Sequence, residues 1–263
     1  MTQVPKTLGN EIGDALNELI RQSDAFRNWN SPEIQAIAHE IEKLKKVDAR
    51  RAFGLLGALS AICGRADDVS VYYSKAAYLP DLQATKLEFY LSFCNVGLYS
   101  KAREIGSWLL DPKRGFYPAY WKRAACFGQI IEVATILPDA KRTYQDLSKE
   151  DFFVVEDAAS VMRIRGFGDA EISSVLELMG EVQRKHGIMF AGYFGSSIQV
   201  VRPPEDEPYL YVTIPVSKSV EFVHAMNRDL IKLIVEKMPD GIFPGGLVMS
   251  FAKAELQELR EAA

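Results

Sequence analysis

The sequence contains few of the residues on which metal and redox sites depend. Its 263 residues include three cysteines and three histidines. No C-x-x-C, H-x-x-x-H or H-E-x-x-H motif occurs, so the common sequence signatures of a zinc site are absent. We expect Cys63, Cys94 and Cys126 to be small buried side chains in a reducing compartment, and we expect no metal and no cofactor.

Motifs of nucleophilic catalysis and phosphate binding are also missing. The chain has neither a G-x-S-x-G elbow nor a G-x-x-x-x-G-K-[ST] loop. The glycine-rich stretch 192–197 leads into a β-rich run and not into a helix, which is more typical of a hairpin turn than of a phosphate loop. These absences favour a protein that is not an enzyme.

Long apolar runs and a strong net charge are absent as well. Charged residues interrupt the apolar stretches well short of a membrane span, and residues 1–6 lack the apolar core of a secretion signal. Lys and Arg number 31 against 35 Asp and Glu, a net charge of -4, which disfavours general nucleic-acid binding. We therefore expect a cytoplasmic protein that binds no membrane.

A helix-turn-helix is an alternative for residues 149–186, because Arg163 and Arg165 precede the glycine-rich break 166–168. A recognition helix carries basic and amide side chains near its start. Here the second helix opens with Asp169 and the adjacent pair Ala170-Glu171, whose carboxylates would repel phosphate. Nucleic-acid binding is therefore unlikely at this position.

Apolar residues at three-to-four spacing predict a series of helices in the first half of the chain. Ser31-Pro32-Glu33 is a typical helix start, with a hydroxyl cap, a proline in the first turn and an early acid. The expected helices cover residues 10–28, a second stretch from Pro32 to Leu44, and then 49–63, 67–79, 82–95 and 99–110.

Features of these helices recur at a spacing of roughly 33 residues, which is typical of stacked helical hairpins. The segment Phe53-x-x-Leu56-Gly57 is followed by Val69-x-x-x-Tyr73, Ala76 and Pro80, and then by Gly97-x-Tyr99-x-x-Ala102. In these positions residues 47–112 resemble a degenerate tetratricopeptide repeat. Ser60 and Gly106 depart from the pattern, because an aromatic is usual at both places. The resemblance implies an open helical groove that binds a protein or peptide.

The second half of the chain changes character. Residues 113–147 suggest one more helix that Pro138 breaks, and 148–187 suggest a helical hairpin with Ser148 and Asp169 as caps. Beyond Gly187, short β-rich runs occupy 188–190, 197–201, 209–214 and 247–251, with a long helix from Ser217 or Ser219 to Lys237 before the last run and a polar helix from Lys253.

This order predicts an α+β protein. We expect a helical-hairpin array over residues 1–147 and an antiparallel sheet with one packed helix over 188–263. Between them, residues 148–187 form a helical hairpin that could belong to either half of the chain. Residues Tyr209 to Ile214 would lie at a sheet edge and could pair across a homodimer.

We expect the partner-binding residues in the groove of the helical array. Aromatic and Arg side chains are enriched at binding hot spots, and those that could face the groove are Arg50, Arg51, Tyr90, Phe93, Trp121, Lys122 and Arg123. At helical spacing such residues are more often part of the core. The basic members favour an acidic partner, and the function expected is that of an adaptor or of a neutraliser of the antitoxin or immunity type.

The alternative is an enzyme or a small-ligand site in the C-terminal half. It would use His224, oriented by Glu221, or the loops 192–197 and 241–246. Pairs of charged residues at this spacing are routine on exposed helices, so His224 is more simply a surface histidine.

Overall fold

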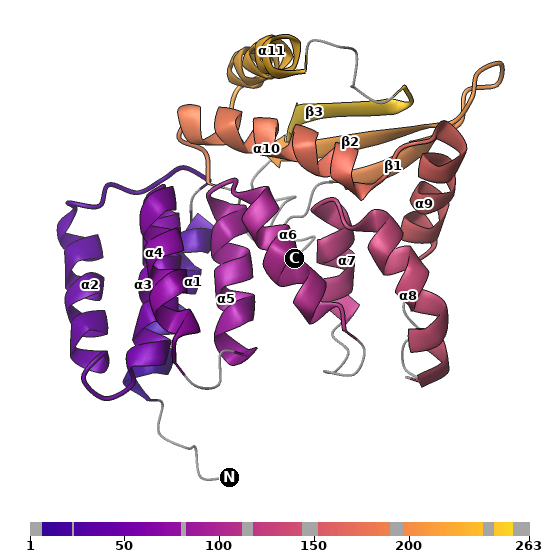
Figure 1. Cartoon of the computed structure of the whole chain (residues 1–263). Coiled ribbons are helices and arrows are strands. Elements are labelled where there is room, and N and C mark those ends of the chain that lie inside the picture. Colours follow the sequence, from indigo (N-terminus) through magenta and orange to yellow (C-terminus); the bar gives the residue numbers. More distant parts are fainter. Residues whose placement is uncertain are drawn as a thin grey trace, which may run out of the picture. The chain divides into compact units, whose positions relative to one another are not determined.

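The computed structural model describes most of the chain as helices with one small sheet (Figure 1). The described residues are 7–22, 24–79, 83–111, 118–143, 152–189, 197–238 and 245–254. They divide into two compact units. The first unit comprises Met1–Ala102 and Gln183–Gly192, and the second comprises Arg103–Val182 and Tyr193–Ala263. Within the described ranges, no helix has both the length and the apolar composition needed to cross a membrane.

The mixed helix and strand content confirms the α+β class. In the first unit the helices are α1 (Leu8–Gln22), α2 (Pro32–Leu44), α3 (Ala49–Ile62), α4 (Ala66–Ala77), α5 (Gln83–Asn95) and the start of α6 (Tyr99–Leu109). These bounds agree with the predicted helices except in the first, which ends several residues earlier than expected.

Local sequence explains where these helices begin and end. Ser31 precedes Pro32 at the start of α2, and the Asp48 side chain accepts a hydrogen bond from the Arg51 backbone at 2.9 Å to cap α3. Gly64 follows α3 with a φ of 69°, a left-handed conformation that glycine adopts without steric cost.

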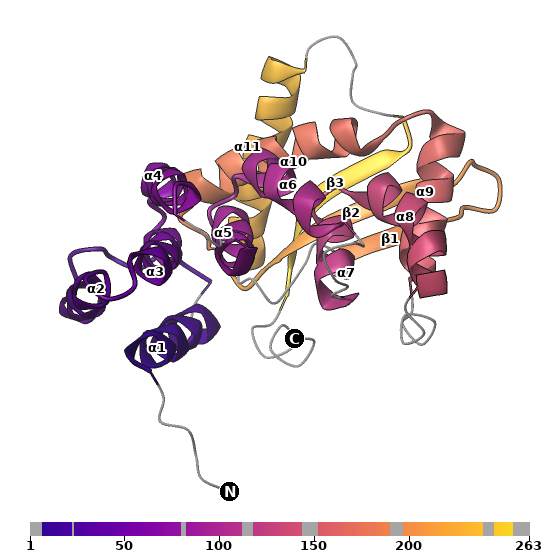
Figure 2. The same ribbon diagram turned by 60° about the horizontal axis from the view of Figure 1, so that its bottom comes forward.

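The helices of the first unit pack around α3. The contacting pairs are α1 with α2, α2 with α3 and α1 with α3, and the same order repeats with α3, α4 and α5. Figure 2 shows α3 in the middle of the other four. Gly57 allows the close approach of α5, because a Cβ atom there would lie 2.5 Å from the Phe89 ring. Leu55, Leu59 and Ile62 of α3 belong to the buried core between these helices.

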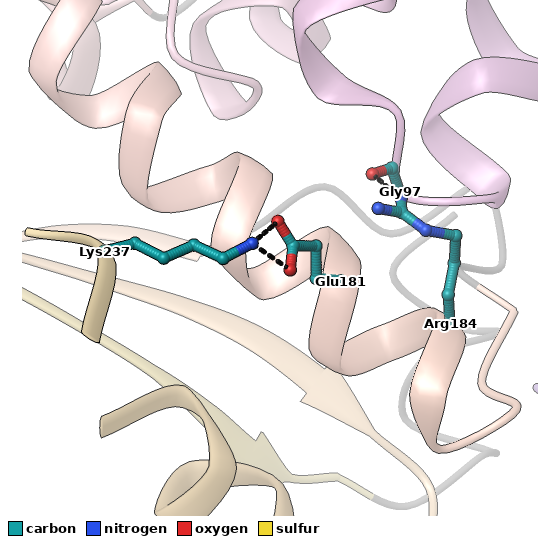
Figure 3. A network of polar contacts seen from close by, with 4 residues as sticks. All are labelled: Gly97, Glu181, Arg184 and Lys237. Carbon is teal, nitrogen blue, oxygen red and sulfur yellow. Dashed lines mark hydrogen bonds and ion pairs between the residues drawn. The ribbon is translucent and has the colours of Figure 1, made fainter. Parts of the chain in front are cut away.

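The second unit contains the remaining helices and the sheet. Its elements are α7 (Pro118–Cys126), α8 (Ile130–Thr143), α9 (Phe153–Arg165), α10 (Asp169–Lys185), β1 (Ser197–Val201), β2 (Tyr209–Val216), α11 (Val220–Lys237) and β3 (Leu247–Lys253). The last turn of α10 belongs to the first unit. Glu181 of α10 pairs with Lys237 of α11 at 2.6 Å within the second unit (Figure 3).

The single helix expected over 113–147 is wrong, because two helices lie there. Gly128, with a φ of 91°, follows α7 and separates it from α8. Pro138 does not end α8 but lies inside it on the exposed side. Val133, Leu137 and Ala140 are fully buried on the other side, and their burial offsets the backbone hydrogen bond that proline cannot make.

The sheet is mixed, which corrects the expected antiparallel sheet. β1 pairs with β2 in antiparallel fashion, and β2 pairs with β3 in parallel fashion. The cause is α11, because a helical crossover between two neighbouring strands returns the chain in the same direction. β2 is therefore the central strand, and the expected dimer pairing through Tyr209 to Ile214 is wrong, since both sides of this strand are occupied.

Other expectations for the C-terminal half lie partly outside the described residues. Ile188 forms an isolated bridge with Ala25 and not a strand. The Ser148 cap and the polar helix after Lys253 lie mainly in 144–151 and 255–263, which the description does not cover. Ser219 caps α11 as expected, since its hydroxyl accepts from the Phe222 backbone at 3.3 Å.

Candidate functional site

A cavity of about 290 Å³ lies in the first unit and is lined by residues of α1, α3 and α5. Its polar walls include Asp14 and Asn17 of α1, Arg51 of α3, and Glu88 and Asn95 of α5. The cavity is near the lower end of the size range of ligand pockets, so it has room for one side chain or a small molecule.

Two glycines, Gly13 of α1 and Gly54 of α3, leave space for the cavity and for the Glu88 carboxyl group. A Cβ atom at Gly54 would overlap the Glu88 carboxylate, whereas a Cβ atom at Gly13 would meet nothing within 4 Å. Glycine inside a helix costs about 0.5–1 kcal/mol relative to alanine. Both glycines therefore lower helix stability at positions where their small size leaves the cavity open.

Glu88 is the carboxyl group of interest in the cavity. Its side chain is half-buried, and burial raises its pKa above the usual value, while the positive charges of Arg51 and Arg50 act in the opposite direction. A largely desolvated carboxyl group of this kind gains free energy when a donor or a cation binds it.

Asn95 lies at the end of α5 and lines the same cavity. Its exposed fraction is 4%, and its Oδ1 atom has no hydrogen-bond partner among the described residues. A buried acceptor without a donor costs roughly 1–3 kcal/mol. A ligand that donates a hydrogen bond there would recover part of this free energy.

The backbone around Asn95 is held by the last turn of α10. The Asn95 carbonyl accepts a hydrogen bond from Gln183 Nε2 at 3.1 Å, and Gln183 Oε1 accepts one from the Tyr99 hydroxyl at 2.8 Å. Arg184 donates to the carbonyls of Val96, at 3.1 Å, and of Gly97. Figure 3 shows the Arg184 guanidinium pointing toward Gly97. The end of α5 is thus fixed by several hydrogen bonds.

Arg51 connects α3 to α1. Its Nη2 atom donates to Asn10 Oδ1 at 2.9 Å and to the Gly9 carbonyl at 3.3 Å. Its Nε atom is buried without a partner among the described residues. Part of the guanidinium is therefore already used to hold α1.

The predicted partner-binding residues are divided between the two units. Arg51 lines the cavity and its neighbour Arg50 is half-buried in the same unit, whereas Arg123 is half-buried on α7 of the other unit. We expected Tyr90, Phe93 and Trp121 to face a groove, and the structure corrects this.

The exposed fraction of these side chains is 0% for Tyr90, 1% for Phe93 and 0% for Trp121. The Phe93 ring packs edge-on against Tyr73 at 5.6 Å, as expected for a core residue. The aromatic side chains at helical spacing bury apolar surface here instead of presenting it to a partner.

Sequence analysis missed Gly13, Glu88 and Asn95, although a signal for the polar wall is present. Polar residues recur at i, i+4 and i+7 along α1 and α5, on one face of each helix. On α1 these are Asn10, Asp14 and Asn17, and on α5 they are Glu88, Ser92 and Asn95. Such polar stripes beside a buried aromatic core indicate a polar cavity between the two helices.

The structure describes the alternative site in the C-terminal half only in part. His224 and Glu221 are exposed on α11, and the pKa of Glu221 is lowered chiefly by a backbone hydrogen bond at the helix start and then by Ser219. Of the loops 192–197 and 241–246, residues 192–196 and 241–244 lie outside the description.

A second hollow of about 410 Å³ lies in the second unit and is lined by Arg165, Glu207 and Tyr209, among others. Arg165 forms an ion pair with Glu207 and donates to the Gly245 carbonyl at 3.3 Å, so its charge is already neutralised. No group of three or more metal-binding side chains occurs among the residues that the structure describes. Comparisons of the chain with family models, with curated proteins and with solved structures give no match.

Proposed function

We propose that this chain is a protein-binding protein, an adaptor or neutraliser, that holds a segment of its partner on the face formed by α1, α3 and α5. The observation that carries the proposal is the cavity between these three alternate helices, whose wall includes the Glu88 carboxyl group and the unsatisfied Oδ1 atom of Asn95. The polar atoms of its wall without a hydrogen-bond partner among the described residues are the Asn95 Oδ1 acceptor and the Arg51 Nε donor.

The packing order of the first unit supports this proposal. Each of α1 and α3 contacts the two helices that follow it, and this order supports a helical-hairpin array with an extended binding surface. The tetratricopeptide-like resemblance of residues 47–112 implies the same surface. The resemblance supports the choice of this surface, while the residues of the cavity indicate which chemical groups the partner presents.

The residues of the cavity favour a different kind of partner from the one that the sequence suggested. The sequence suggested an acidic partner because of Arg50, Arg51, Lys122 and Arg123. Arg51 is partly used by Asn10 and Gly9 of the same chain, and the wall of the cavity offers the acceptor oxygens of Glu88 and Asn95. The surface therefore favours a partner segment that donates hydrogen bonds.

Site-specific photo-crosslinking in the native host tests the proposal. A photoreactive residue is introduced at Asn17, which is exposed and lines the cavity, and separately at Ala77, which is exposed on α4. We expect a discrete protein adduct from the Asn17 position and none from Ala77. Adducts of equal yield and identity from both positions, or an adduct from Ala77 alone, would contradict the proposal.

A further inference from the structure

We infer that the outer side of α11 is a pairing surface for α11 of a second copy of this chain, with the two helices antiparallel. The inference is independent of the proposed function, because α11 belongs to the second unit. It is carried by two exposed apolar residues of this helix, Ile231 and Val235, and by the charged side chains of Lys232 and Glu236 beside them.

The two halves of α11 differ in burial. In the first half Val223, Met226 and Leu230 are buried, and the Asn227 amide holds the helix against β3. This amide donates to the Phe251 carbonyl at 2.9 Å and accepts from the Phe251 backbone at 2.8 Å.

Beyond Leu230, none of the residues of α11 is buried. Most of them are nevertheless apolar, namely Ile231, Leu233, Ile234 and Val235. Figure 2 shows this end of α11 projecting past α10. A helix segment that is apolar on several sides is normally covered by other parts of a protein, so the second half of α11 has the composition of a contact surface.

The exposed side of α11 has the residue spacing of a helix-pairing seam. His224, Arg228, Ile231 and Val235 are exposed and follow one another at intervals of four, three and four residues, as the core positions of a coiled coil do. The exposed fraction is 61% for Ile231 and 68% for Val235, and the two residues lie one turn apart on the same side of the helix. A second helix laid along this side would remove both from water, which is favourable.

The charges beside this apolar pair favour a second copy of the chain as the second helix. If a two-fold axis lies at the level of residue 233, Ile231 of one copy faces Val235 of the other. Lys232 then lies only about 3 Å along the helix axis from Glu236 of the second copy. Because the arrangement is symmetric, the same ion pair forms twice.

The same charges favour the antiparallel orientation. In a parallel pair, Lys232 would lie beside Lys232 of the second copy and Glu236 beside Glu236, and like charges repel. In the antiparallel pair, the exposed Arg228 instead lies near the carboxyl end of the other helix, where a cation is favoured.

Contacts within the chain leave both members of this ion pair accessible. The Lys232 side chain is 77% exposed, and its contact with Asp229 of the same helix is long, at 3.9 Å. Glu236 is exposed. The neighbouring Lys237 does not contribute, because Glu181 of α10 binds it at 2.6 Å.

Sedimentation equilibrium of the full chain tests the inference. We expect a reversible dimer with a dissociation constant on the order of 10–100 μM, because one helix from each copy forms a smaller interface than a stable complex has. Val235→Asp places a charge at the centre of the seam and should weaken the dimer at least about tenfold. The matched control is Val71→Asp, at an exposed valine of α4 in the first unit, and it should associate as the wild type does.

A wild type that stays monomeric at about 1 mM overturns the inference. A dimer that Val235→Asp leaves unchanged, or that Val71→Asp weakens equally, overturns it as well, because the contact between copies then lies elsewhere.

Charge reversal tests the antiparallel arrangement separately. Lys232→Glu and Glu236→Lys each place like charges across the interface, so each variant alone should dimerise at least about threefold more weakly than the wild type. In an equimolar mixture the two variants present opposite charges at both contacts, and the mixed dimer should recover about the wild-type affinity. Neither variant has the Lys232 and Glu236 pair within its own helix, so this recovery reports a contact between copies. A mixture that associates no better than either variant alone overturns the inferred arrangement.

Discussion

Gln183 Nε2 donates a hydrogen bond to the backbone carbonyl of Asn95 at 3.1 Å, and so connects the last turn of α10 to the end of α5. Both residues are almost fully buried, and 88 positions separate them in the sequence. The same Gln183 side chain accepts from Tyr99. The residue whose amide borders the cavity is therefore positioned by a contact that no local pattern of the sequence reveals.

Replacing this glutamine tests how much the connection stabilises the fold. Gln183→Met keeps the length of the side chain but leaves the Asn95 carbonyl and the Tyr99 hydroxyl without this partner. Each unsatisfied buried polar group costs roughly 1–3 kcal/mol, so we expect the free energy of unfolding to fall by about 2–4 kcal/mol. Urea denaturation measures it, and a loss below about 0.5 kcal/mol would show that the contact is dispensable.

Gly13 and Gly166 provide a matched pair, because a Cβ atom at either position would meet nothing within 4 Å. Gly13 lies inside α1, whereas Gly166 ends α9 with a φ of 73°. We expect Gly13→Ala to raise the free energy of unfolding by about 0.5–1 kcal/mol. Gly166→Ala should lower it by about 1 kcal/mol, because alanine is strained in the left-handed region. Equal effects of the two changes on the free energy of unfolding would contradict the conclusion that the cavity leaves room for a side chain at position 13.

The raised pKa of Glu88 predicts how stability depends on pH. Burial raises the pKa, Arg51 and Arg50 oppose the shift, and Asp48 adds to it. Because the folded-state pKa exceeds the unfolded value, the contribution of this group is greatest below the unfolded pKa and is lost as pH rises through the folded pKa.

Glu88→Gln isolates this effect from the other carboxyl groups. Near pH 4 the wild type and the variant should have similar free energies of unfolding, because Glu88 is then mostly neutral. At pH 7 the variant should be the more stable of the two. Denaturant titrations at both pH values provide the comparison, and a variant that is relatively less stable at pH 7 than at pH 4 would reverse the predicted sign.

Asp169 caps a different helix from the one that the sequence suggested. Its two carboxylate oxygens accept hydrogen bonds from the backbone of Ile131 and Glu132, each at 2.9 Å, at the start of α8. Asp169→Ala should lower the free energy of unfolding by about 1–2 kcal/mol, and Asp169→Asn by less, since the amide keeps one acceptor. A larger loss for asparagine than for alanine would contradict the capping role.

The features that could be predicted from the sequence are those that depend on residues close together in the chain. Ser31 and Pro32 mark the start of α2, and Ser219 marks the start of α11. The prediction that Pro138 breaks a helix was wrong, because the buried residues on either side of it hold α8 together. The direction of β3 was misjudged although the strand, long helix and strand that specify a parallel pair were recognised.

The candidate site was predictable only in part. Arg51 was identified, but the aromatic residues that were grouped with it belong to the core. The polar stripes of α1 and α5 are visible in the sequence, yet it takes the packing of both helices against α3 to show that they border one cavity. The burial of Glu88 follows from that packing, and composition alone does not contain it.

The most direct test of the account is the affinity of the crosslinked partner, once it is identified, for purified wild type, Gly13→Leu and Ala77→Leu, measured by calorimetry. The account predicts that Gly13→Leu weakens binding by at least about tenfold, while Ala77→Leu binds as the wild type does and all three proteins stay folded. Equal affinity of the three proteins would contradict the claim that the partner occupies the cavity between α1, α3 and α5.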